Sequence, residues 1–188
     1  MLRNILLFFF EVNMLKSKKP NGFTLIELLV AIAIGAVFIA LGAGTIKKAF
    51  NASDEGQLNS DLTGLLTDTK ILKDAKGYGD GRSGVNLIPD LIGAERLPTT
   101  ITLVAGVPMN SSGGSYTLVS TAAGVGYEVA TNKLPKSLCI SAATTQAKSG
   151  IASTIKINSS TFSGTVSRSQ ALTACNQTEN TISFVVNG

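Results

Sequence analysis

The sequence predicts an α+β fold in which a long N-terminal α-helix packs on an antiparallel β-sheet. Three observations support this prediction. An apolar run over residues 23–46 contains only one charged residue. A helical repeat of apolar residues then continues as far as residue 76. From residue 100 onward, short runs rich in Thr, Val and Ile alternate with Gly, Pro and Asn, which is typical of strands joined by turns.

Length and composition predict one globular domain with a hydrophobic anchor. The chain has 188 residues, with 16 Lys and Arg, 12 Asp and Glu, and no His, and this length suits a single domain plus one extra segment. Four of the basic residues and one acid precede Phe23, so the remainder carries 12 basic and 11 acidic side chains. This nearly neutral balance gives no support for nucleic-acid binding.

The apolar run over residues 23–46 is long enough for a transmembrane helix. Its 24 residues correspond to about 36 Å of α-helix, which exceeds a hydrocarbon core of about 30 Å. Lys16, Lys18 and Lys19 precede the run and place its N-terminal end in the cytoplasm by the positive-inside rule. Glu27 is the exception, because a carboxylate inside an apolar segment is costly. It is either a functional residue or an acid of the first helical turn, where the helix dipole favours it.

Residues 47–76 are expected to continue the helix as an amphipathic segment. Residues at helical spacing predict a stripe that covers a sheet, and they are Leu58, Leu62, Leu65, Thr69, Leu72 and Lys76. Asp61 is expected on another face of this helix. Gly77, which follows Lys76, predicts the end of the helix, and Gly56 leaves a bend open.

Beyond residue 76 the sequence predicts a globular head, residues 77–188. We expect a short helix in the Gly-rich loop at its start. The runs TITLVAGV and SYTLVST are predicted to pair as a hairpin around residues 108–114, and residues 126–131 to form the next strand.

The C-terminal part of the head is expected to contain two helices and three strands. Pro135 is predicted at the first position of one helix. Ser167 with Gln170 fits a capping box that opens the other. The remaining apolar runs are expected as strands, with STIKIN and TFSGTV at the edge of the sheet and residues 181–186 last.

The junction between the basic segment and the apolar run resembles the processing site of type IV prepilins. The resemblance rests on GFTLIE at residues 22–27, with KKPNG, a basic and turn-forming segment, leading into it. In that family a membrane peptidase cuts after the glycine and methylates the new N-terminus. The resemblance therefore implies that residues 1–22 are a cleaved leader, that Gly22 is its last residue, and that Phe23 is the N-methylated first residue. Starts at Met1 and Met14 give the same mature chain.

The resemblance also implies a role for Glu27 in assembly, where its carboxylate meets the N-terminal amine of a neighbouring subunit. Simple electrostatics supports this role. An α-amine with a pKa of about 8 is mostly cationic at neutral pH, and charges buried between apolar helices are tolerated only when they are paired. Such a pair would set the axial register of the assembly.

Cys139 and Cys175 are the only cysteines. In an exported domain an even count favours a disulfide, which would close the C-terminal segment. Two separate buried thiols are the alternative. A long segment between two cysteines, with a helix such as SQALTAC before the second, is similar to type IVb pilins. Bundle-forming and toxin-coregulated pilins are the nearest comparison.

The resemblance implies a structural subunit that polymerises with copies of itself into an extracellular pilus, serving adhesion, aggregation, conjugation or motility. It implies a single-pass stage in the inner membrane, and as partners the prepilin peptidase, a platform protein, an assembly ATPase and a secretin. A minor pilin or a type II secretion pseudopilin is the alternative within the superfamily. A membrane-anchored periplasmic binding protein or enzyme is the alternative from another class.

The sequence does not favour an enzyme. It has no His, no P-loop pattern and no GxSxG motif, and no carboxylates and cysteines have metal-ligand spacing. We therefore expect no cofactor, no metal ion and no nucleic-acid partner.

Overall fold

The computed structural model describes residues 24–188, except for the side chains of residues 37–51. The expected leader, residues 1–22, and Phe23 lie outside the described residues. The chain divides into two compact units, Met1–Thr45 and Ile46–Gly188.

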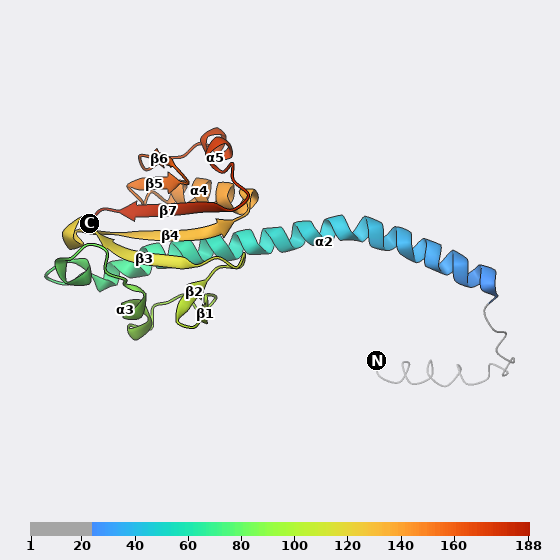
Figure 1. Cartoon of the computed structure of the whole chain (residues 1–188), viewed down its shortest axis with the longest axis horizontal. Coiled ribbons are helices and arrows are strands. Elements are labelled where there is room, and N and C mark those ends of the chain that lie inside the picture. Colours follow the sequence, from blue (N-terminus) through green and yellow to red (C-terminus); the bar gives the residue numbers. More distant parts are fainter. Residues whose placement is uncertain (1–23) are drawn as a thin grey trace, which may run out of the picture. The chain divides into compact units, whose positions relative to one another are not determined.

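The longest element is helix α2, Leu25–Asp68 (Figure 1). Within the second unit it passes through Gly56 without a break, because a helical glycine costs only about 1 kcal/mol and the packing of its neighbours outweighs that. The predicted apolar stripe is confirmed by the leucines of this helix that are at most 1% exposed, namely Leu58, Leu62, Leu65 and Leu66.

Helix α2 ends earlier than the sequence predicts. A 3-10 turn, η2 (Thr69–Leu72), follows it and Lys73 is extended, so the predicted helical end at residue 76 is wrong. The last carbonyls of a helix lack backbone partners. One of them, at Leu66, accepts a hydrogen bond from the hydroxyl of Tyr127, which lies in the sheet. A tertiary contact thus satisfies one of the polar groups at the end of the helix.

The head contains a five-stranded antiparallel sheet with the strand order β3-β4-β7-β5-β6 (Figure 1). In that order the strands are Tyr116–Thr121, Gly126–Leu134, Asn180–Val186, Thr154–Ile157 and Ser160–Phe162. The predicted final strand is therefore confirmed as β7, and it lies in the centre of the sheet. STIKIN was predicted at the edge, which is wrong, because β5 pairs on one side with β6 and on the other with β7.

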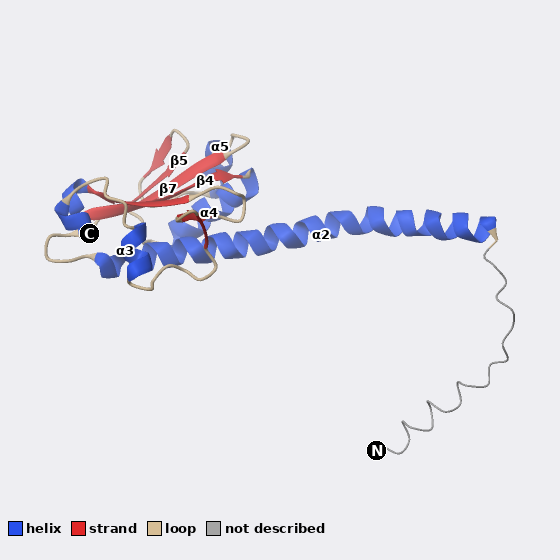
Figure 2. Cartoon of the chain, turned by 60° about the horizontal axis from the view of Figure 1, so that its bottom comes forward, coloured by secondary structure: helices blue, strands red, loops and turns tan. Residues whose placement is uncertain are grey.

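One face of the sheet is buried beneath helices, and Figure 2 shows α4 and the C-terminal part of α2 on the same side of the strands. A row of apolar residues at matching register positions crosses this face, made up of Leu118, Val129, Phe184 and Ile155, all fully buried. The opposite face carries an ion pair of 3.2 Å between Lys156 Nζ and Glu128 Oε2. Because successive side chains of a strand point to opposite faces of the sheet, the apolar row and the ion pair lie on different faces.

The predicted hairpin between TITLVAGV and SYTLVST is present only as a turn, in which the Asn110 N–H donates to the Gly114 carbonyl at 2.9 Å, and a single antiparallel bridge between Met109 and Ser115. The two runs do not pair as strands. The first run folds back on itself as strands β1 (Thr102–Val104) and β2 (Val107–Met109), while β3 pairs with β4. Ala105 and Gly106 both have positive φ, 51° and 81°, which is the backbone of the two-residue turn that closes tight hairpins. Because alanine rarely adopts a positive φ, the sequence did not predict a turn at this position.

The short helices largely follow the sequence. Helix α3 (Ile88–Gly93) is the helix expected in the Gly-rich loop. Helix α4 (Lys136–Ser149) begins one residue later than predicted, with Pro135 at its N-cap. The predicted capping box of α5 (Arg168–Ala174) is confirmed, with Ser167 and Gln170 bonded reciprocally.

In the part of the chain that the structure describes, no helix has both the length and the apolar composition needed to cross a membrane. The predicted span over residues 23–46 includes Phe23 and the side chains from residue 37 on, which lie outside that description.

Candidate functional site

The first turn of α2 is closed by a reciprocal capping box between Thr24 and Glu27. The backbone N–H and the hydroxyl of Thr24 each donate to Glu27 Oε2 at 2.9 Å. The backbone N–H of Glu27 donates to Thr24 Oγ1 at 3.3 Å. These bonds occupy donors that the start of a helix leaves without partners. The carboxylate is thereby fixed in orientation at the N-terminal end of the helix.

The pattern Thr-x-x-Glu is a known sequence signal for such a box, yet the sequence reasoning identified Glu27 only as an acid of the first turn or an assembly residue. The structure places it in the first turn. Both interpretations are compatible with this position, because a capping carboxylate uses only part of its hydrogen-bonding capacity. Of its two oxygens, Oε2 receives both bonds from Thr24.

Glu27 is surrounded by apolar side chains that face solvent. Ile26, Val30, Ala31 and Ile34 line the surface beside the carboxylate. The large apolar residues that are more than half exposed on these first turns are Leu25, Ile26, Leu28, Leu29, Val30, Ile32 and Ile34. They point in all directions around the helix, which is typical of a helix buried in lipid or in other protein. A contiguous apolar surface of this kind marks an interaction site.

The two residues expected at the processing site, Gly22 and Phe23, lie outside the described residues. The structure therefore describes the site from Thr24 onward, and the chain begins its helix only two residues after Phe23.

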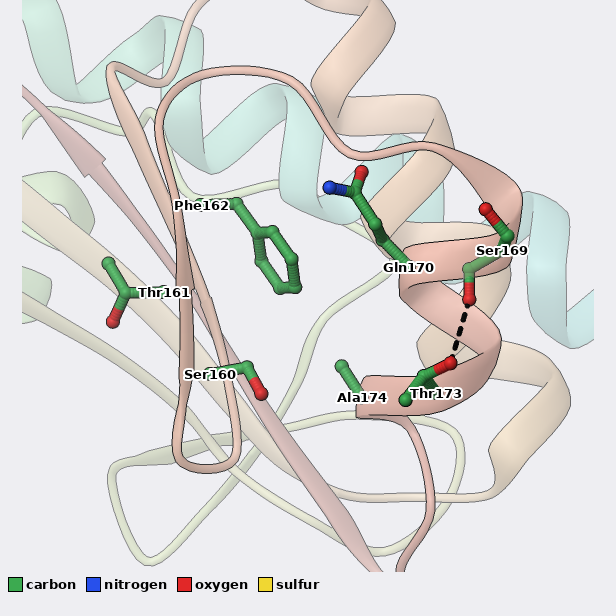
Figure 3. A pocket seen from close by; sticks show the side chains of 7 residues that line it. All are labelled: Ser160, Thr161, Phe162, Ser169, Gln170, Thr173 and Ala174. Atoms are coloured by element: carbon green, nitrogen blue, oxygen red, sulfur yellow. Dashed lines mark hydrogen bonds between the residues drawn. The ribbon is translucent and has the colours of Figure 1, made fainter.

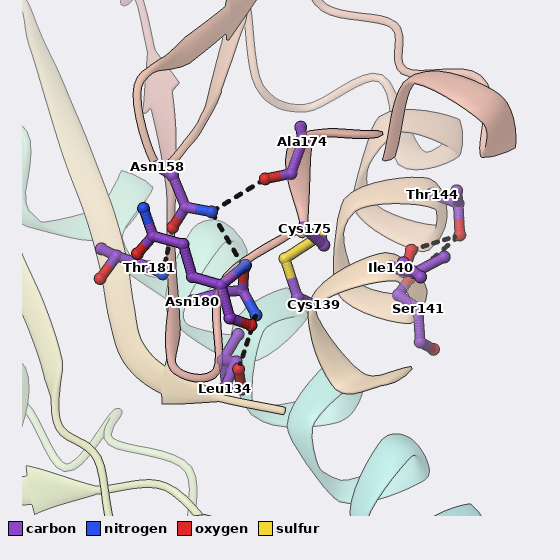
Figure 4. The surroundings of a disulfide bond; sticks show 11 residues. Leu134, Cys139, Ile140, Ser141, Thr144, Asn158, Ala174, Cys175, Asn180 and Thr181 are labelled. Atoms are coloured by element: carbon purple, nitrogen blue, oxygen red, sulfur yellow. Dashed lines mark hydrogen bonds between the residues drawn. A yellow bond between two sulfur atoms is a disulfide. The ribbon is translucent and has the colours of Figure 1, made fainter. Parts of the chain in front are cut away.

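The second feature predicted from the sequence is the disulfide, and Cys139 and Cys175 are bonded, with 6.0 Å between their Cα atoms. Figure 4 shows the bond joining α4 to the end of α5. Both cysteines are fully buried. The predicted disulfide-closed C-terminal segment is therefore confirmed.

Next to the disulfide lies a pair of asparagines that sequence reasoning missed (Figure 4). Asn158 Nδ2 donates to the Ala174 carbonyl at 2.8 Å and to Asn180 Oδ1 at 2.9 Å. Asn180 Nδ2 donates to the Leu134 carbonyl at 3.1 Å. Through these bonds the pair joins the end of α5 to β4 and β7. The same bonds give partners to polar groups that would otherwise be left unsatisfied inside the protein. Nothing in the sequence around either asparagine marks this role.

Asp61 was expected on a face of α2 away from the stripe, and this prediction is wrong, because the residue is 1% exposed. Its carboxylate accepts a hydrogen bond from the hydroxyl of Thr100 and one of 3.1 Å from the hydroxyl of Tyr116. Burial raises the pKa of Asp61, and the two hydrogen bonds oppose that rise. Burial also raises the pKa of Tyr116, and the nearby Asp61 charge adds to that effect.

The contact between α2 and α4 is polar. Asn59 Nδ2 donates to Ser141 Oγ at 3.1 Å, and Gln146 Nε2 donates to the Asn59 carbonyl at 3.1 Å and to Thr63 Oγ1 at 3.0 Å. The disulfide-closed segment is thus joined to the N-terminal helix by directional bonds.

Over the described residues, no group of three or more His, Cys, Asp and Glu side chains could hold a metal ion. The described residues thus form an apolar helix end with one oriented carboxylate in the first unit, and a disulfide-closed fold in the second. The chemistry of the helix end is that of an assembly surface.

Comparison with known proteins gives two family matches. The description "PilS N terminal" matches residues 52–187, and "Prokaryotic N-terminal methylation motif" matches residues 17–43. No curated protein matches the sequence.

Two solved structures are similar to the chain. A crystal structure of a type IVb pilin from Salmonella typhi is 27% identical with a TM-score of 0.58, and the match covers 73% of this chain and 99% of that one. An NMR structure of the type IVb pilin PilS from Salmonella typhi is 28% identical with a TM-score of 0.48, covering 70% and 96%.

Proposed function

This chain belongs to the PilS family of type IVb pilins, and from that premise we propose that it polymerises through its N-terminal helix into an extracellular type IV pilus. Membership of the family and the N-terminal methylation motif make it a pilin subunit. The predicted resemblance to type IVb pilins is thus confirmed. Pilins are structural proteins, which agrees with the expectation that the chain is not an enzyme.

One observation carries the proposal. The first turns of α2 present apolar side chains on every side, and among them stands a single carboxylate, Glu27, held by Thr24. Such a surface is stable only in lipid or against other apolar helices. Copies of the same helix supply that environment when they pack together, so the surface suits a filament core.

In this proposal, cleavage after Gly22 frees the amine of Phe23, which is then methylated. The amine is cationic at neutral pH. Glu27 of one subunit pairs with the amine of Phe23 in the next, because an unpaired charge among apolar helices is strongly unfavourable. The pair fixes how far each subunit is displaced along the filament axis.

Before assembly, residues 23–46 hold the subunit in the inner membrane, with the N-terminus in the cytoplasm. The basic side chains of Lys16, Lys18 and Lys19 favour this orientation. The partners of this route are the prepilin peptidase, the platform protein, the assembly ATPase and the secretin. The head, residues 77–188, remains outside the membrane. The finished pilus serves adhesion, aggregation, conjugation or motility.

The test is mass spectrometry of filaments sheared from cells that make the chain, with cells lacking the prepilin peptidase as the control. We expect a protein that begins at N-methylated Phe23 in the first case and no filaments in the second. Sheared material that retains residues 1–22 would contradict the proposal. Electron microscopy with and without the gene then distinguishes a major subunit, whose loss removes the filament, from a minor one.

A further inference from the structure

A groove of about 550 Å³ lies in the head between the edge strand β6 and helix α5. Figure 3 shows the side chains of Ser160 and Phe162 directed toward α5, where Gln170 and Ala174 face them. Thr161, Ser169 and Thr173 complete the lining of the groove. The volume is within the range of about 300–1,000 Å³ that is usual for small-ligand sites.

The lining of this groove combines one aromatic ring with neutral hydrogen-bonding groups. No charged side chain lines it. Phe162 is half-buried against the core, so one part of its ring is fixed by packing while another part faces the groove. A ring held in this way offers a rigid apolar surface to a ligand.

The polar groups are oriented by the structure. Gln170 Oε1 accepts the backbone N–H of Ser167 at 2.8 Å as part of the capping box. Its Nε2 is thereby turned toward the groove, beside Phe162 (Figure 3). An amide nitrogen donates two hydrogen bonds, and the Ser160 hydroxyl both donates and accepts. The groove therefore offers an oriented amide donor, a hydroxyl and an apolar face.

We propose that this groove binds a neutral saccharide residue. A pyranose ring has an apolar face of C–H groups and a rim of hydroxyls that donate and accept hydrogen bonds, which matches an aromatic ring flanked by an amide and a hydroxyl. The absence of charge from the lining favours a neutral sugar over a uronic or sialic acid. The site lies wholly in the head and does not depend on assembly through α2.

The test is NMR titration of the full ¹⁵N-labelled chain in a phosphocholine detergent, since glycoside detergents would compete. The probes are the methyl glycosides of glucose, galactose, mannose and N-acetylglucosamine, with methyl glucuronide as the charged comparison. At least one neutral glycoside should give saturable shifts at the amides of Ser160, Phe162 and Gln170, with a dissociation constant in the millimolar range. Stronger binding of the glucuronide, or no saturable shift with any neutral glycoside, would overturn the proposal.

Two variants separate binding from folding. Phe162→Leu keeps an apolar residue but removes the ring, and we expect about fivefold to tenfold weaker binding from the lost stacking surface. Gln170→Glu keeps a capping-box residue but replaces the amide donor, and should weaken binding similarly. Thr117→Ala on β3, the edge strand at the other side of the sheet, is the matched control, because Thr117 is exposed and does not line the groove, and binding should be unchanged. Equal affinity in all three variants would show that the shifts arise elsewhere.

Discussion

At the scale of single residues, two of the acids of α2, Glu27 and Asp61, show how position decides what a carboxylate does. Glu27 is exposed and surrounded by apolar side chains, and its side-chain hydrogen bonds to described residues are those to Thr24 in its own first turn. Asp61 is buried and joins α2 to Thr100 and Tyr116 in the head. Glu27 is therefore suited to bind a partner outside the subunit, whereas the hydrogen bonds of Asp61 hold α2 against the rest of the same subunit.

Replacing Glu27 by Gln separates its two roles. Glutamine at this position can still accept the capping bonds of Thr24, but it carries no charge to pair with an amine. We expect a folded, membrane-held subunit whose filament yield falls about tenfold or more, because an unpaired buried amine costs several kcal/mol. Filament yield is measured by quantitative blotting of sheared material against total subunit.

The matched control for this change is Thr24→Ala, which removes the cap hydroxyl but leaves the carboxylate of Glu27. Its filament yield should stay close to that of the unchanged chain. If Thr24→Ala reduces assembly as much as Glu27→Gln does, the carboxylate acts only by capping the helix.

The raised pKa of Asp61 predicts that the stability of the protein depends on pH. Its pKa in the folded state is raised by burial, so between its unfolded value of about 3.9 and the folded value the native state binds more protons than the unfolded chain. The free energy of unfolding contributed by this residue therefore falls as pH rises through that window. Asp61→Asn removes this contribution.

The measurement is urea unfolding of both proteins at several pH values. We expect the wild type to be more stable relative to Asp61→Asn below about pH 4 than at pH 7. The exposed Glu179→Gln change controls for net charge. A wild-type advantage that stays constant or grows with pH would refute the assignment.

At the scale of elements, the disulfide-closed segment is the part that ties the head together. The bond links α4 to the end of α5. α4 also contacts α2 through Gln146, and the end of α5 contacts β7 through Asn158 and Asn180. Loss of the cross-link should loosen all of these contacts.

The double change Cys139→Ala and Cys175→Ala removes the bond without adding buried polar atoms. The cysteines are 36 positions apart, and closing a loop of this length stabilises by about 4 kcal/mol in the chain-entropy model. We expect a loss of this order in urea unfolding. Adding a thiol reductant to the variant should have no further effect, whereas the wild type should lose stability. A loss below about 1 kcal/mol would show that packing alone holds the segment.

At the scale of the whole molecule, the chain divides into an N-terminal unit, Met1–Thr45, and a second unit, Ile46–Gly188, which has its own core. The buried core residues lie between Leu58 and Val186, all within the unit Ile46–Gly188. A chain of residues 46–188 therefore keeps all the buried core side chains that the structure describes.

A chain of residues 46–188 should fold as a soluble monomer that does not enter filaments. Its circular dichroism should show cooperative unfolding, and its elution in size-exclusion chromatography should match one subunit. Cells that make both this chain and the full chain should shear off filaments that contain only the latter. Incorporation of the shortened chain would show that the head alone drives assembly.

Much of the head could be predicted from local sequence. The leucine stripe of α2, the final strand and the capping box at Ser167 depend on residues close together in the chain. Predictions failed where distant groups decide the outcome. The helix ends at Asp68, close to the Leu66 carbonyl that the distant Tyr127 hydroxyl binds. TITLVAGV folds on itself through a turn with positive φ at Ala105.

The sequence by itself determined the family resemblance, the apolar character of the N-terminal helix and the candidate residues Gly22, Phe23, Glu27, Cys139 and Cys175. These follow from contiguous motifs and from residue counts. Only the tertiary structure decided which strand lies in the centre of the sheet, that Asp61 is buried, and that Phe162 and Gln170 face one groove. Such facts depend on contacts between residues far apart in the chain, and periodicity within a segment carries no information about them.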